Sequence, residues 1–296
     1  MTRIFALIVG IDSYKSGYTW NLQSSTHDAK QIRNWLTKDL HVPSDHISLL
    51  LDRKATRENL QAELIRHFLQ NPAIQPGDAM LFYFAGHGSS IEAPPGWYET
   101  DDLSEEDNNV VNVLCTYDHD CRRKDGSEGR TVGISDRALL SFMDDLAIEK
   151  GNNITLILDT CFAADMHSSK RLMHLSDTRW TKTVKAGPSD LQMEAESGIS
   201  TSFTRRSRPG FSQTSSNYSV IAACLPGERA AENKVGGRFT SSLLNAVVRF
   251  HFTRLRKHFV DLSFLIETPS VNLAIILGDS IERCGRTHGR PSASIV

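Results

Sequence analysis

Residues 78–88, DAMLFYFAGHG, join a continuous apolar run to an abrupt glycine-rich ending. A run of this length without alternating polar residues is typical of a strand that is buried on both faces of a sheet. Two other runs have the same form: Ile4 to Ile11, which leads into Asp12, and Ile154 to Leu158, which leads into Asp159-Thr160-Cys161. The sequence therefore predicts buried strands at residues 4–11, 78–85 and 154–158, each followed by polar residues.

The segments between these strands predict helices and shorter strands. Apolar residues recur at helical spacing in three of them, and Thr56 is a residue type that caps helices. The predicted helices are Ser25–Leu40, a helix that follows Thr56 and runs through Phe68, and Ser135–Ala147. The predicted shorter strands are Ile47–Leu51 and Val111–Thr116, with a loop at residues 89–110. This order predicts an α/β fold with an open, mostly parallel sheet that is flanked by helices on both faces.

Carboxylate, imidazole and thiol side chains, which can take part in catalysis or binding, follow the ends of the predicted strands. In open parallel sheets, function gathers at the carboxyl ends of the strands. Here those ends carry Asp12, His87, Asp118 and Cys161. We therefore expect these four residues to lie along one edge of the sheet.

The second half of the chain divides into two parts. Residues 166–216 are rich in Ser, Thr, Lys and Arg, which predicts a flexible, exposed linker after a first region at residues 1–165. Residues 217–296 are predicted to complete the same sheet, with a strand at Tyr218–Cys224 and a helix from about Arg238.

Composition excludes several classes of protein. The formal net charge of the 296 residues is −2, which gives no reason to expect nucleic acid or an anionic membrane as a partner. The five cysteines are an odd number without a CxxC pair, which argues against a disulfide framework or a structural zinc site. No signal peptide and no membrane-spanning run are recognised. We expect a cytoplasmic protein, with the nucleus as an alternative.

Cys161 and His87 together suggest nucleophilic catalysis. A cysteine peptidase needs a thiolate, a histidine that moves a proton, and N–H groups aimed at the developing oxyanion. A helix that begins at Cys161 would lower the pKa of the thiol, and Gly88 can bring its N–H close to a substrate. Taken singly, Cys161 could equally be a buried packing residue, and His87 a turn residue or a metal ligand.

The combination resembles the metacaspases and other caspase-like cysteine peptidases. The runs that carry the resemblance are ALIVGIDSY (6–14), LFYFAGHGS (81–89), ILDTCFAAD (157–165), IAACLPGERAAE (221–232) and GGRFTSSLL (236–244). The resemblance implies a caspase–haemoglobinase fold, in which residues 1–165 correspond to the large subunit and 217–296 to the small one. It implies a cysteine endopeptidase acting on proteins or peptides, with Cys161 as nucleophile and His87 as base. The N–H groups of Gly88 and Cys161 would form the oxyanion hole.

The same resemblance implies a substrate pocket that binds arginine or lysine. Its carboxylates would be Asp28 and Asp159, and Ala85 replaces a family serine at the pocket rim. Two carboxylates in a narrow pocket favour a basic residue before the cleaved bond. The family's His-Ser-Gly after the cysteine is Phe162-Ala163-Ala164 here, so an inactive caspase-like module that binds other proteins is the alternative.

No cofactor is expected for the chemistry, although calcium is possible, because many metacaspases need it. Hard carboxylate oxygens near the predicted site suit that ion. The candidate ligands are Asp118, Asp120, Asp125, Asp136 and Asp165. The oligomeric state stays open.

The basic residues of the predicted linker lie close in sequence to this acidic pocket. We expect self-cleavage after one or more of them, because a tethered segment has a high effective concentration. The candidates are Lys170, Arg171, Arg179, Lys182, Lys185, Arg205, Arg206 and Arg208.

Overall fold

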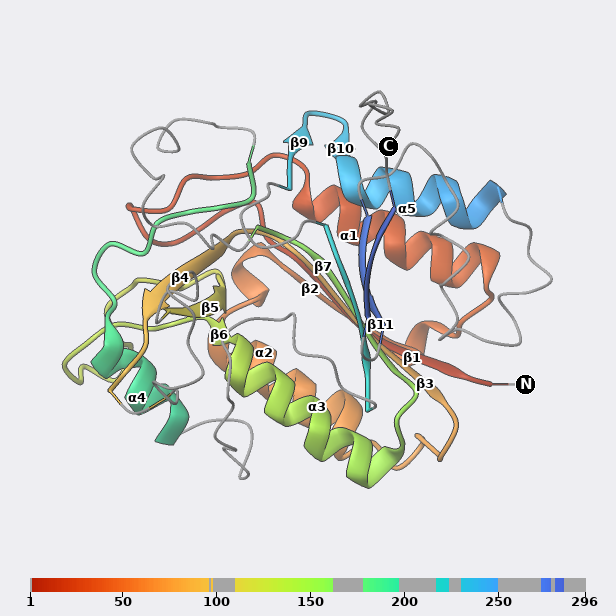
Figure 1. Cartoon of the computed structure of the whole chain (residues 1–296), viewed down its shortest axis with the longest axis horizontal. Helices are drawn as coiled ribbons and strands as arrows, with labels where there is room; N and C mark the ends of the chain where they lie inside the picture. The colour runs from red at the N-terminus through yellow and green to blue at the C-terminus, as the bar shows by residue number, and fades with distance from the viewer. Residues whose placement is uncertain are drawn as a thin grey trace, which may run out of the picture.

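A seven-stranded sheet with strand order β12-β11-β8-β7-β3-β1-β2 forms the centre of the molecule (Figure 1). The computed structural model describes residues 2–95, 97, 110–161, 178–196, 217–223, 230–249, 273–277 and 280–284. The parallel strands are β1 (Ile4–Gly10), β2 (Ile47–Leu51), β3 (Ala79–Ala85), β7 (Ile154–Asp159) and β8 (Ser219–Ala222). Strands β11 (Leu273–Leu277) and β12 (Ser280–Cys284) extend it antiparallel. The predicted α/β fold is confirmed.

Helices cover both faces of this sheet (Figure 1). On one face lie α1 (Ser25–Asn34), which a π-helical turn continues to Asp39, and α5 (Arg238–Arg249). On the other lie α2 (Arg57–Glu63), continued by a π-helical turn to Leu69, and α3 (Asp136–Lys150). Alternate residues of β1 supply the two cores: Ala6 and Ile8 face α1, whereas Leu7 and Val9 face α2 and α3. Burial of both faces explains the unbroken apolar runs.

The parallel strands end level with one another. Gly10 of β1 pairs with Ala85 of β3, and Ala85 pairs with Asp159 of β7. His87 and Cys161 each follow two residues later, so they emerge at neighbouring strand ends. Asp12 follows the end of β1 and caps α1: its carboxylate accepts hydrogen bonds from the N–H groups of Ser25 (2.6 Å) and Thr26 (3.1 Å).

A second, antiparallel sheet corrects two predictions. It contains β4 (Gly88–Glu92), β5 (Val110–Leu114) and β6 (Ile134–Ser135), so the predicted loop at 89–110 is wrong where β4 lies. The predicted strand Val111–Thr116 exists as β5 but belongs to this sheet rather than the main one. Strand β4 begins with Gly-Ser-Ser and has no apolar pattern that would predict a strand, because only its Ile91 packs into the small core of this sheet.

The predicted flexible, exposed linker at residues 166–216 differs from the structure at residues 178–196, which are ordered. They include α4 (Pro188–Glu196), whose Leu191 is fully buried. Arg179 is also fully buried. Main-chain hydrogen bonds fix the segment, and composition does not reveal them. Residues 166–177 and 197–216 lie outside the described residues, as do Phe162-Ala163-Ala164 and the expected helix start after Cys161. The boundaries at 165 and 217 stay predictions.

The remaining described elements are short. They are two 3₁₀ turns at Ser44–His46 and Asp52–Lys54, and the hairpin of β9 (Glu232–Asn233) and β10 (Gly236–Gly237). Thr56 caps α2 as predicted, accepting a hydrogen bond from the Asn59 N–H at 3.3 Å. None of the helices within the described ranges is long and apolar enough to cross a bilayer.

We predict that Asp12→Ala lowers the free energy of unfolding by about 1–2 kcal/mol, because α1 loses the carboxylate at its amino end. Urea denaturation measures the change. Asp45→Ala, at an exposed carboxylate, is the control and should leave the denaturation midpoint unchanged. Equal midpoints for Asp12→Ala and the parent chain would contradict the capping role.

Candidate active site

Cys161 lies just beyond the end of β7 and is 2% exposed. Its N–H donates a hydrogen bond to the carbonyl oxygen of Arg179 at 3.1 Å. Its Sγ atom accepts a hydrogen bond from the Ala230 N–H at 2.9 Å and donates one to the Ala230 carbonyl at 3.2 Å. The thiol therefore rests against the chain segment that precedes β9.

His87 lies just beyond the end of β3 and is also 2% exposed. Its backbone N–H donates to the Tyr14 hydroxyl at 2.7 Å, and its ring Nε2 lies 2.9 Å from the Trp20 carbonyl oxygen. A carbonyl can only accept, so Nε2 carries the hydrogen and Nδ1 is the basic nitrogen of the neutral ring. Nδ1 is buried and makes no hydrogen bond of ordinary geometry with the described residues.

Burial sets the charge of this histidine. It lowers the pKa of His87 to about 4, although contacts with the backbone of Trp20 and of Arg179 favour the charged ring. The nearby Arg179 charge lowers the pKa further. His87 is therefore neutral at physiological pH and can accept a proton through Nδ1.

Two backbone N–H groups converge on one carbonyl oxygen at this edge. Gly88 donates to the Arg179 carbonyl at 3.0 Å, and Cys161 donates to the same oxygen. Only glycine fits at position 88, because a Cβ atom there would lie 1.9 Å from the backbone oxygen of Cys161. Two N–H donors on one oxygen are the arrangement that stabilises an oxyanion.

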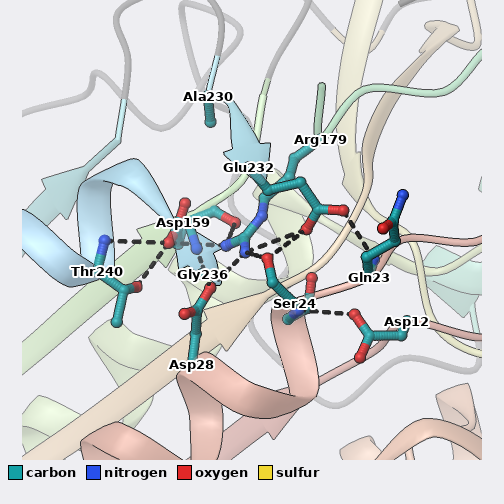
Figure 2. Close-up of polar contacts among 12 residues, drawn as sticks. Asp12, Gln23, Ser24, Asp28, Asp159, Arg179, Ala230, Glu232, Gly236 and Thr240 are labelled. Atoms are coloured by element: carbon teal, nitrogen blue, oxygen red, sulfur yellow. Dashed lines mark hydrogen bonds and ion pairs between the residues drawn. The ribbon is translucent and has the colours of Figure 1, made fainter. Parts of the chain in front are cut away.

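The Arg179 side chain enters a buried acidic pocket (Figure 2). Its Nη1 atom lies 2.7 Å from Asp159 Oδ2, and its Nη2 atom contacts Asp28 Oδ2. Nη2 also lies 3.4 Å from Glu232 Oε2 and 3.2 Å from Ser24 Oγ. Asp28 and Asp159, which the sequence pairs as pocket residues, therefore meet on one guanidinium, together with Glu232.

Separate elements position the three carboxylates (Figure 2). Asp28, in the first turn of α1, accepts a hydrogen bond from the Gly237 N–H at 2.9 Å. Asp159, the last residue of β7, accepts one from Thr240 Oγ1 of α5 at 2.6 Å. Glu232 of β9 accepts from the Gln23 N–H at 2.7 Å and from Ser24 Oγ at 2.8 Å. The pocket thus joins residues from the first, middle and last thirds of the chain.

The pocket is electrostatically unbalanced towards negative charge. Burial raises the pKa of Asp28 to about 6; Arg179 opposes this rise and the Asp159 charge adds to it. Burial lowers the pKa of Arg179, but Asp159 and Asp28 raise it more, so the guanidinium stays charged. Three carboxylates around one guanidinium suit a strongly basic group.

Sequence reasoning missed several contributors. Glu232 ends the run 221–232 but was not recognised as a pocket residue, and the Trp20 carbonyl has no signature in a sequence. Arg179 was only one of eight basic residues in the predicted linker. Ala85 lies fully buried in the core that α1 and α5 cover, and its role in substrate binding stays a prediction.

The described carboxylates considered for calcium accept hydrogen bonds from the protein itself. Asp118 accepts a hydrogen bond from the Arg57 N–H, Asp120 from three N–H groups at residues 184–186, and Asp136 from the Arg137 N–H. Within the described ranges, no three His, Cys, Asp or Glu side chains gather as a metal site requires. Asp125 binds Ser127, and Asp165 lies outside those ranges. Calcium binding therefore stays a prediction.

The chain matches the family Peptidase_C14, the caspase domain, over residues 3–263. The protein therefore belongs to the caspase domain family, and the predicted resemblance is confirmed at that level. It is similar to metacaspase-1 of Mycosarcoma maydis, at 31% identity over 96 residues, and to metacaspase-3 of Arabidopsis thaliana, at 27% over 125 residues.

These alignments cover 31% and 40% of this chain but only 23% and 31% of the relatives' own lengths. The matched regions thus span less than a third of the length of each relative. A solved structure of a Geobacter sulfurreducens protein has a TM-score of 0.60 and covers 94% of both chains at 14% identity, which shows a shared fold.

We predict that Gly237→Ala lowers the free energy of unfolding by about 1–3 kcal/mol, because an added Cβ overpacks the pocket. That atom would lie 2.7 Å from Arg179 Nη2, from Asp159 Oδ2 and from Asp28 Oδ2. Gly187→Ala is the matched control, since nothing lies within 4 Å of its added Cβ. Chemical denaturation of both variants measures the difference, and equal stabilities would contradict the tight packing of the pocket.

Proposed function

We propose that the protein is a cysteine endopeptidase that cleaves peptides after arginine or lysine, with Cys161 as nucleophile and His87 as its acid–base partner. One observation carries this proposal. The chain holds an arginine with its side chain among three carboxylates and its carbonyl oxygen on the N–H groups of Gly88 and Cys161. A substrate residue before a cleaved bond needs both of these contacts at once.

The proposed reaction begins with proton transfer from the Cys161 thiol to Nδ1 of His87. The thiolate attacks the carbonyl carbon, and the N–H groups of Gly88 and Cys161 stabilise the negative oxygen. His87 then gives its proton to the leaving amine, and the C–N bond breaks. Water, deprotonated by His87, attacks the thioester and releases a carboxylate and the thiol. The Trp20 carbonyl holds Nε2 and so keeps Nδ1 available throughout.

Specificity follows from the pocket charge. A guanidinium or ammonium group gains charge-assisted hydrogen bonds to Asp28, Asp159 and Glu232, whereas a carboxylate side chain would meet three like charges. Arginine matches the pocket best, because its planar fork contacts several carboxylates together.

An inactive, protein-binding member of the family is the alternative. Its support is the replacement of the family residues at 162–164, which lie outside the described residues. The buried basic nitrogen of His87 and the paired N–H donors support the enzyme instead, because a binding module needs neither.

Cys161→Ala and His87→Ala should each lower the rate of peptidyl-arginine hydrolysis by at least about 1000-fold, because each removes a reacting group. The assay uses fluorogenic peptides, with each substitution made in the parent chain and in an Arg179→Gln variant whose pocket lacks its own arginine. Cys121→Ser, at a cysteine away from the pocket, is the control and should keep parental activity. Hydrolysis by Cys161→Ala at the parental rate would exclude this mechanism.

Asp159→Asn should lower kcat/KM for arginyl substrates by about 10- to 150-fold, which corresponds to the loss of about 1.5–3 kcal/mol from a buried charged hydrogen bond. Asp125→Asn, at a surface carboxylate, is the matched control. Steady-state kinetics with both variants measure the change, and equal kcat/KM values would remove Asp159 from the substrate pocket.

The KM for arginyl substrates should rise as pH falls towards about 6, because the pKa of Asp28 is about 6 with a guanidinium in the pocket and is higher without one. Burial raises the pKa of Asp28 to about 6. Protonation of this carboxylate removes one of the charges that bind arginine. His87, with a pKa lowered to about 4 by burial, stays neutral in this range. Asp28→Asn should lose this pH dependence of KM. A parental KM that stays constant between about pH 5 and pH 8 would contradict the titration.

A further inference from the structure

The loop between β1 and α1, residues 12–22, holds His87 at two points. The Tyr14 hydroxyl accepts a hydrogen bond from the His87 N–H at 2.7 Å, and the Trp20 carbonyl oxygen lies 2.9 Å from Nε2 of the ring. The Tyr14 and His87 rings also contact each other, with centroids 5.1 Å apart. The conformation of one loop therefore determines both the position of the His87 main chain and the direction of its imidazole.

The Asn21 side chain connects these two contacts. Its Oδ1 atom accepts a hydrogen bond from the Tyr14 N–H at 3.0 Å. The Trp20 carbonyl belongs to the peptide unit between Trp20 and Asn21, and a peptide unit is planar. A bond that fixes Asn21 therefore also restricts the direction in which the Trp20 carbonyl points.

The start of the loop is fixed by a different side chain. Asp52 Oδ1 accepts hydrogen bonds from the N–H groups at residues 12 and 13, both at 2.9 Å. Tyr14 is the next residue, so its position does not depend on Asn21 alone. Loss of the Asn21 side chain should therefore loosen the part of the loop that carries the Trp20 carbonyl and leave Tyr14 in place.

The Asn21 side chain lies at the surface, although its bond to Tyr14 is partly buried. Substitutions at exposed positions usually change the free energy of unfolding little. The consequence of this bond is therefore to be sought in the geometry of His87 rather than in the stability of the fold.

The geometry decides which nitrogen of His87 carries the hydrogen. In a neutral imidazole, an acceptor fixed beside one nitrogen keeps the hydrogen there and leaves the other nitrogen basic. The Trp20 carbonyl is such an acceptor at Nε2. If this carbonyl turned away, the hydrogen could move to Nδ1, and His87 could then no longer take a proton from Cys161 through that atom.

We propose that Asn21 is a positioning residue, whose bond to the Tyr14 N–H keeps the Trp20 carbonyl against Nε2 of His87 and so keeps Nδ1 free for the Cys161 proton. The kinetic consequence rests on the proposed function, whereas the effect on the tautomer requires no turnover. None of the described hydrogen bonds joins Asn21 to Cys161 or to the carboxylates of the pocket, so Asn21 acts through the Trp20 carbonyl.

Nitrogen NMR of the imidazole tests the tautomer directly. The protein carries isotope-labelled histidine and Cys161→Ala, so that no turnover occurs, and His87→Gln identifies the His87 signals. Burial lowers the pKa of His87 to about 4, so the ring is neutral at about pH 7 and should carry its hydrogen on Nε2 only. Asn21→Ala should give a mixture of both tautomers, and Asn21→Asp, which keeps an acceptor oxygen, should restore the single one. A single Nε2–H tautomer in Asn21→Ala would overturn the inference.

Two further variants separate the Asn21 bond from a general loosening of the loop. Tyr14→Phe removes the hydroxyl beside the His87 N–H but keeps the Tyr14 N–H and its bond to Asn21, so it should keep the Nε2–H tautomer. Asn21→Leu, which is similar in size but has no acceptor, should show the same mixture as Asn21→Ala. An equal mixture in Tyr14→Phe and Asn21→Ala, or a single tautomer in Asn21→Leu, would contradict the assignment.

Steady-state kinetics with a peptidyl-arginine substrate measure the consequence for the reaction. Asn21→Ala should lower kcat by about 10- to 100-fold, the range found when partners that orient metal-binding histidines are replaced. KM should stay within about 2-fold of the parent, because the acidic pocket is unchanged. Asn21→Asp should recover most of kcat. Asn59→Ala, at an exposed asparagine of α2, is the matched control and should keep parental kinetics.

The kinetic split also has a contrary outcome. A rise in KM at unchanged kcat would show that Asn21 acts on the substrate pocket, and a parental kcat in Asn21→Ala would show that it acts on nothing in the reaction. Either result would remove the positioning role.

The two measurements separate failure of this inference from failure of the proposed function. Urea denaturation identifies the variants that are folded. Hydrolysis by the parent chain together with a single tautomer in Asn21→Ala would overturn the inference and leave the peptidase. An absence of hydrolysis in every folded variant, together with the expected tautomers, would instead overturn the proposed function and leave Asn21 as the residue that orients His87.

Discussion

The burial of the Arg179 charge is the constraint on which the organisation of the site depends. The charge of a guanidinium without exposed surface must be balanced by carboxylates. Removing one partner of a buried ion pair lowers the free energy of unfolding by about 3–5 kcal/mol. Asp28, Asp159 and Glu232 come from α1, β7 and β9, so this one side chain fixes how those three elements meet. The same contacts hold the Arg179 carbonyl at the N–H groups of Gly88 and Cys161.

The fold supplies the geometry for this contact. Because β1, β3 and β7 are parallel and end in register, the residues that follow them meet at one edge of the sheet. Asp12 fixes the start of α1 and thereby the direction of Asp28, and Tyr14 holds the backbone of His87. Neither residue touches the Arg179 side chain in the described contacts, but Asp12 positions the helix whose Asp28 does.

The sequence predicted what depends on local pattern. Unbroken apolar runs identified the strands of the parallel sheet, and their polar endings identified Asp12, His87 and Cys161 as residues of one edge. Asp118, the fourth residue expected there, follows β5 of the antiparallel sheet instead. It could not identify β4, whose Gly-Ser-Ser start carries little apolar surface, or the order of residues 178–196, which depends on N–H groups bonded to Asp120. Glu232 and Trp20 were missed because their contacts join residues about 210 and 67 positions apart, as Gln23 with Glu232 and Trp20 with His87 show.

The central claim is that the acidic pocket selects the residue before the cleaved bond. A library of peptides that vary only at this residue, offered to the Arg179→Gln enzyme, tests it most directly, because the pocket then lacks its own arginine. The account predicts cleavage after arginine, weaker cleavage after lysine and none after aspartate. Preferential cleavage after aspartate or after an apolar residue would contradict it.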